Sequence, residues 1–140
     1  MTNSTTDSMV AHQIFEDLIV SVLAVNNYSL HKAYGLLYKL REVGILDLSV
    51  LSGEALNARE IRGKLVAAGY NRGEYVEVLI SERIEKILSS IRGMGSDDFL
   101  LSLVGDSSLI AQKLSGLYGV GPRVISNFIN LRDFPNPSID

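Results

Sequence analysis

Apolar residues recur at every third or fourth position along almost the whole chain, which is the spacing of one face of an α-helix. No stretch alternates apolar and polar residues for long enough to predict a β-strand. The periodic segments, which glycines and small polar residues separate, are about 10–25, 29–43, 57–69, 71–91, 96–104, 106–116 and 123–131. We therefore expect an all-α fold, a single compact domain of six to seven helices over residues 9–132. A disordered leader (1–8) and an extended tail (133–140) flank it.

Two of the predicted helices begin with the same local signature. Asn57 and Glu60 stand three residues apart, and so do Asn71 and Glu74. An asparagine followed by a glutamate at this spacing is typical of a capping box, in which each side chain bonds the backbone of the other residue. The sequence therefore predicts that Asn57 and Asn71 are the N-caps of the third and fourth helices.

Composition and charge exclude several classes of protein. The chain has 140 residues, 46% of them hydrophobic, which is enough for one core and too apolar for a disordered chain. It has no cysteine, which excludes disulfides, thiol catalysis and a cysteine-ligated iron–sulfur cluster. The net charge of −3 does not suggest a nucleic-acid partner. Binding to DNA would therefore require a local patch or backbone amides.

Nothing in the sequence predicts a membrane partner or a metal held by side chains. No run reaches the roughly 18 apolar residues of a membrane span, and the first eight residues lack the basic start of a signal peptide. His12 and His31 have no metal-ligand partner at a useful spacing. We expect an intracellular protein, in the cytoplasm or nucleoid, or in the nucleus of a eukaryote.

The most informative segment is 117–123, L-Y-G-V-G-P-R. Gly119 and Gly121 allow positive φ angles, and so predict a very tight turn between two helices. Pro122 suits the first turn of the second helix, where its missing N–H would be unpaired anyway. The amides of Gly119, Gly121 and Arg123 would then point outward at a helix N-terminus, which is suited to a phosphate. An ordinary helical hairpin with a glycine-rich turn is the alternative.

This segment resembles the helix-hairpin-helix motif of DNA-binding proteins, commonly L-P-G-V-G-P-K-T-A. The resemblance implies that the hairpin holds a phosphate of double-stranded DNA without reading sequence. The DNA-binding residues that it implies at the hairpin are Gly119, Val120, Gly121, Pro122, Arg123 and Lys113, with Arg132 as a further nearby cation. It also implies a monovalent cation held by the backbone carbonyls of Ser115, Leu117 and Val120. No other cofactor is expected.

The order of the predicted helices resembles the six-helix barrel of the helix-hairpin-helix DNA glycosylase superfamily. The sequence F-E-D-L-I-V-S-V-L-A (15–24) resembles its buried first helix, and L-V-A-A-G-Y-N-R-G-E (65–74) resembles a later connection. The loop V-N-N-Y-S (25–29) is most similar to the asparagine-rich loop of the 8-oxoguanine glycosylases. The resemblance implies that Asn26 and Asn27 lie against the duplex beside an extruded base. A plain helix end and turn is the alternative for these two residues.

The superfamily carries a catalytic aspartate about twenty residues after the hairpin, and Asp140 lies 21 residues after Gly119. The resemblance implies that this carboxylate stabilises a cationic transition state or activates water during base excision. Arg123 stands where the bifunctional enzymes carry a nucleophilic lysine, and a guanidinium cannot form a Schiff base. A monofunctional base-excision-repair glycosylase, without lyase activity, is therefore the first hypothesis.

Other functions remain open beside this one. Asp140 could be a terminal acid without a role, and the chain a non-catalytic DNA-binding module or a subunit of a larger complex. A helical scaffold without DNA contact is a third hypothesis, because the net charge is negative. Members of the superfamily continue past the catalytic aspartate, so a second chain that completes the active site is a further candidate partner.

Overall fold

The computed structural model describes residues 4–52 and 56–132, and in these residues it consists of nine helices and no strand. The helices are α1 (Ser4–Leu23), α2 (Leu30–Tyr34), α3 (Leu37–Glu42), α4 (Ser49–Ser52), α5 (Ala58–Ala67), α6 (Glu74–Met94), α7 (Ser96–Leu101), α8 (Ser107–Ser115) and α9 (Pro122–Leu131). The predicted all-α, single-domain fold is confirmed, with more and shorter helices in the first half of the chain than the periodicity indicates.

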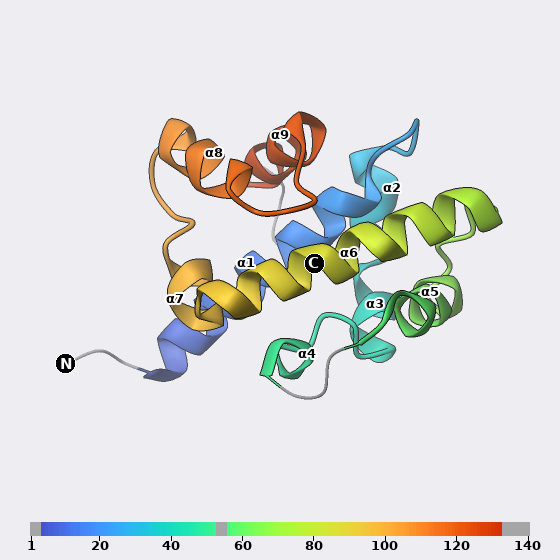
Figure 1. Ribbon diagram of the computed structural model, residues 1–140, viewed down its shortest axis with the longest axis horizontal. Helices are drawn as coiled ribbons and strands as arrows, with labels where there is room; N and C mark the ends of the chain where they lie inside the picture. Colours follow the sequence, from blue (N-terminus) through green and yellow to red (C-terminus); the bar gives the residue numbers. More distant parts are fainter. Residues whose placement is uncertain (1–3, 53–55, 133–140) are drawn as a thin grey trace.

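The two longest helices, α1 and α6, run through the middle of the molecule (Figure 1). In this view α8 and α9 lie on one side of them, and α3, α4 and α5 lie on the other. α9 packs against α1, α5 packs against α6, and α7 contacts both central helices. The hairpin that joins α8 to α9 therefore rests on the central pair.

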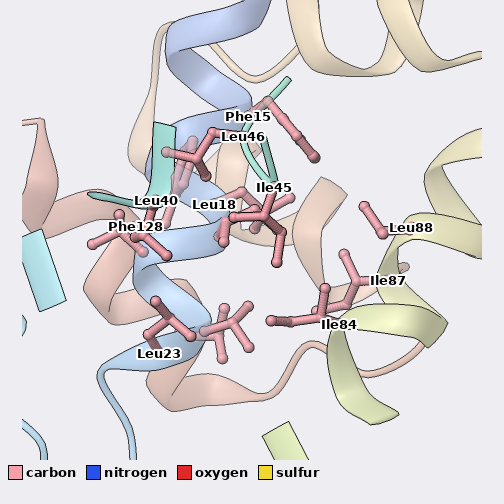
Figure 2. Close-up of a cluster of buried hydrophobic side chains, with 14 of the residues drawn as sticks. Phe15, Leu18, Leu23, Leu40, Ile45, Leu46, Ile84, Ile87, Leu88 and Phe128 are labelled. Carbon is pink, nitrogen blue, oxygen red and sulfur yellow. The ribbon is translucent and has the colours of Figure 1, made fainter. Parts of the chain in front are cut away.

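The second half of α1 is buried on nearly all sides, because other helices surround it. Its residues with no exposed surface are Phe15, Leu18, Ile19, Val20, Ser21, Val22 and Leu23. Side chains from α1, α6 and α9 point into one cluster between these helices (Figure 2). Burial of each large apolar side chain contributes about 1.5–3 kcal/mol to the free energy of folding. The burial of this cluster is therefore the main contribution that holds α9 beside α1 and α6.

Two helix boundaries differ from the sequence-based expectation. α1 begins at Ser4, so residues 4–8 are helical instead of belonging to a leader. This segment contains neither glycine nor proline, and Asp7 lies in the first turn, where a negative charge favours the helix. The predicted helix 29–43 is divided into α2 and α3 at Gly35 and Leu36, where the Leu36 N–H bonds the Ala33 carbonyl (3.1 Å) in a tighter turn. Residues 1–3 and the expected tail, 133–140, lie outside the described residues.

One of the two predicted capping boxes forms and the other does not. The Asn57 side chain accepts from the Glu60 N–H at 2.8 Å, and the Glu60 carboxylate accepts from the Asn57 N–H at 3.2 Å, which confirms the first. The second is wrong, because α6 begins at Glu74 with Gly73 as its N-cap. The buried Glu77 carboxylate instead accepts from the N–H groups of Arg72 and Gly73, at 2.8 and 2.9 Å.

Candidate nucleic-acid interface

The connection between α8 and α9 contains three glycines (Gly116, Gly119 and Gly121) and requires glycine at position 119. Gly119 has a φ of 98°, which side chains rarely tolerate. A Cβ atom there would also lie 3.2 Å from Cγ1 of Ile87 and 3.3 Å from the carbonyl oxygen of Arg83. Gly119 therefore lets the hairpin lie directly on α6. The expected positive φ at Gly121 is wrong, since this residue is extended (φ −109°, ψ −179°) and a Cβ there would meet open space.

The N-terminus of α9 is open. Pro122 is its first residue, as predicted, and the N-cap Gly121 has no side chain to bond the first-turn amides. Across the part of the chain that the structure describes, no acceptor bonds the N–H groups of Gly119, Gly121 or Arg123. These donors and the positive end of the helix dipole are therefore available to an anion.

The open N-terminus faces a groove of about 570 Å³ between the hairpin and α6. Residues 118–124 form one wall, and Leu79, Glu82, Arg83 and Lys86 of α6 form the other. The groove holds three cationic side chains (Arg83, Lys86 and Arg123) and one carboxylate. Although the whole chain carries a net charge of −3, this groove is locally positive.

Tyr118 is the first residue of the hairpin wall of this groove. Its N–H donates to Oγ of Ser90 at 3.2 Å, which ties the turn to α6. The ring is mostly exposed, and Nζ of Lys86 lies 5.2 Å from its centroid, within the range of a cation–π contact. This contact holds the Lys86 ammonium beside the hairpin, where both residues line the groove.

Two cations that the sequence assigned to the hairpin lie elsewhere. Nζ of Lys113 donates to the Ser102 carbonyl at 2.9 Å, so its charge is at the end of α7. Arg132 lines a different hollow, which it shares with Asp17. Neither lines the hairpin groove, where Arg83 and Lys86 of α6 supply the charge instead. Those two residues show no signal in the sequence, because only tertiary packing brings α6 to the hairpin.

Asn26 and Asn27 form an exposed turn at the end of α1, and both have left-handed backbones, with φ values of 56° and 68°. Nδ2 of the buried Asn127 in α9 donates to the carbonyls of Ser21 (3.0 Å) and Ala24 (2.8 Å), near the end of α1. The end of α1, which leads directly into this turn, is therefore bonded to the helix that carries the open N-terminus. Both sequence-based interpretations fit this geometry, since the turn ends a helix and its side chains face solvent.

The remaining expected site residues are the cation-binding carbonyls and the catalytic aspartate. In the described residues the carbonyls of Ser115 and Val120 accept no hydrogen bond, and that of Leu117 accepts one from the Val120 N–H at 3.3 Å. The described chain contains no cluster of His, Asp or Glu side chains that could hold a metal ion. Asp140 lies outside the described residues.

Comparisons of this chain with protein-family models, with curated proteins and with solved structures found no match. None of the helices in the described ranges is both long and apolar enough to cross a membrane.

Proposed function

We propose that this protein binds the phosphate backbone of double-stranded DNA at the α8–α9 hairpin, without reading the base sequence. The observation that carries the proposal is the open N-terminus of α9, which faces a groove with three cationic side chains. Backbone amides at a helix N-terminus hold phosphate oxygens well, and such contacts carry no sequence information. An acidic protein can bind DNA in this way because it needs only a local donor site.

The N-cap residue of α9 is also not the one that would stabilise the helix most. A serine or aspartate at position 121 would stabilise α9 by about 1 kcal/mol through a side-chain cap, and glycine forgoes this. Without a side chain, the amides stay accessible to a large anion. A monovalent cation on the free carbonyls of Ser115 and Val120, with that of Leu117, would add positive charge beside the same amides.

Gly121→Asp tests the proposal sharply. An aspartate at an N-cap stabilises a helix, and the Cβ at this position meets open space, so the variant should melt at or above the wild-type temperature. Its carboxylate would occupy the amides and repel phosphate. We expect the affinity for a short labelled duplex, measured by fluorescence anisotropy, to fall at least about tenfold, as when one hydrogen bond to a charged group is lost.

The control is Gly63→Asp, which adds the same charge at an exposed position of α5 where a Cβ also meets open space. It should bind the duplex as the wild type does. Equal affinities of the two variants would refute a phosphate site at the hairpin and would favour a helical scaffold without DNA contact.

We further propose that the bound duplex is a substrate for base excision, with Asp140 as the catalytic carboxylate. The observation that favours this activity over binding alone is the exposed Asn26–Asn27 turn, which follows the end of α1 that Asn127 bonds to the hairpin helix. A base must leave the stack before its glycosidic bond can be cleaved, and an adjoining loop can fill the space that it leaves. The guanidinium of Arg123 cannot attack the sugar as a lysine amine does, so the product should be an intact abasic site.

The test is an excision assay on a panel of duplexes, each with one damaged base. We expect release of a base without strand nicking and without a complex that borohydride can trap. Asp140→Asn should abolish release and leave affinity for the duplex unchanged, whereas Asp133→Asn, on the same segment of the chain, should remain active. Nicked products would contradict the monofunctional assignment. Binding without release from any duplex would identify a DNA-binding module.

A further inference from the structure

The end of α1 is held in an unusual backbone conformation. Asn26 and Asn27 are the two non-glycine residues with positive φ in the described chain, and they are consecutive. Asparagine tolerates the left-handed region better than most residues, but two in a row persist only where the surroundings hold them. The question is which side chains hold this turn.

Most of the bonds to the turn come from Arg72, in the connection between α5 and α6. Nη1 donates to the Val25 carbonyl at 3.1 Å, and Nη2 donates to the Asn26 carbonyl. The guanidinium carbon lies 4.7 Å from the centroid of the Tyr28 ring, in a cation–π contact on the far side of the turn. One planar group thus binds the residues before, within and after the Asn26–Asn27 turn. The ammonium of a lysine lacks the planar fork and the flat face of a guanidinium, so it could not make these two bonds and the ring contact in the same arrangement.

Arg72 is itself anchored from two sides. Its N–H donates to Oε2 of the buried Glu77, whose Oε1 pairs with Nη2 of Arg62 at 3.0 Å. Its Nη1 also donates to the hydroxyl of the fully buried Tyr70, which donates in turn to the Leu23 carbonyl at 2.8 Å. The guanidinium therefore has a fixed place at the negative end of the α1 dipole, where a cation is stabilised.

We infer that Arg72 is a positioning residue of the DNA interface, which holds the Asn26–Asn27 turn so that its two amide side chains can enter a duplex at a vacated base position. The inference rests on the proposed function. Arg72 acts through the turn, since three of its five guanidinium donors bond the Val25 and Asn26 carbonyls and the Tyr70 hydroxyl. A turn held in advance loses little conformational freedom when it binds, and this raises affinity for DNA that is already open.

The experiment compares affinity for an intact duplex with affinity for a duplex that carries a stable abasic-site analogue. Wild type should prefer the abasic duplex, because no base has to be unstacked there. In Arg72→Ala this preference should fall about tenfold, as for a lost hydrogen bond to a charged group, while binding to the intact duplex through the hairpin is unchanged. Arg72→Lys, which keeps the charge but not the bridge, should be intermediate.

Arg92→Ala is the matched control. Arg92 also bonds two consecutive carbonyls, those of Val50 and Leu51, but at the opposite end of α6. Its removal should lower the melting temperature as Arg72→Ala does and leave the preference for the abasic duplex intact. A similar loss of preference in Arg92→Ala would mean that general destabilisation explains the effect, and would overturn the inference.

A double-variant cycle separates positioning from direct contact. Asn26→Gly with Asn27→Gly keeps the left-handed turn accessible but removes its amide side chains, so it should lose the preference by itself. Adding Arg72→Ala should then cause no further loss, because both changes disable the same turn. Additive losses would overturn the positioning role. A wild type that binds no duplex at all would instead refute the proposed function, so the two failures are distinguishable.

Discussion

Asp17 and Glu16 are adjacent acids of α1 in different surroundings. Glu16 is buried and accepts two bonds from the Arg41 guanidinium, at 2.8 and 3.0 Å. Asp17 is half-buried beside a hollow of about 270 Å³, with Ile14, Phe128 and Arg132 among its lining residues. Burial, and secondly the charge of Glu16, raise the pKa of Asp17 from 3.8 to about 7. The neutral carboxylic acid is thus favoured in the folded protein.

This shift predicts a stability that falls as the pH rises. Between pH 4 and 7 the folded protein keeps the Asp17 proton and the unfolded chain does not, so stability decreases across this window and levels off above it. Asp17→Asn, which mimics the neutral acid, should leave stability at pH 4 unchanged. At pH 8 it should raise it by about 2 kcal/mol, less than the full shift would give because the side chain is partly exposed.

Urea unfolding at several pH values measures this effect, and Asp47→Asn is the control. The pKa of the exposed Asp47 is lowered by the Ser49 N–H bond, so Asp47 contributes stability above its unfolded pKa, which is lost only as the pH falls through its folded value. Asp47→Asn should therefore follow the wild-type slope between pH 5 and 8. If Asp17→Asn follows that slope as well, the assigned surroundings of Asp17 are wrong.

At the scale of helices, the sequence predicted a helix start correctly where the capping hydrogen bonds join residues of the same turn. Asn57 and Glu60 form their capping box because both partners lie within one turn. Asn71 and Glu74 have the same spacing, yet Glu77 takes the amides at the start of α6, since its carboxylate also pairs with Arg62 from α5. The sequence pattern alone does not show whether the first amides of a helix bond a nearby N-cap side chain or a carboxylate that another helix holds in place.

In the hairpin, too, some features could be predicted from neighbouring residues, whereas others depend on tertiary packing. Its position, its Pro122 start and its open amides follow from seven consecutive residues, and the structure contains all three. The groove does not follow from them. Its α6 wall with Arg83 and Lys86, and the close approach of Gly119 to Ile87, depend on how the two central helices pack. The amides and Arg123 were therefore predictable from the sequence, whereas the other two of the three cations, Arg83 and Lys86, were not.

For the whole molecule, the net charge of −3 opposes the binding of DNA, whereas the positive groove favours it. At distances beyond the Debye length, about 10 Å at 0.1 M salt, the net charge repels a polyanion weakly. At contact, the groove supplies three cations and uncharged amide donors. Amide bonds to phosphate displace few counterions, so the affinity should depend on salt less than that of a basic DNA-binding protein.

The salt dependence of binding can therefore be predicted from the groove. If its three cations neutralise two to three phosphates, log K should fall with log[salt] with a slope of roughly −2 to −3, at about 0.9 per phosphate. Lys86→Ala should make the slope shallower by about 1, because it removes one neutralised phosphate. Lys113→Ala should leave it unchanged, since that ammonium bonds the Ser102 carbonyl outside the groove.

Titrations of a labelled duplex at several salt concentrations measure all three slopes. A wild-type slope near −6 would mean that a wider basic surface binds DNA, and an effect of Lys113→Ala equal to that of Lys86→Ala would show that the groove is not the contact.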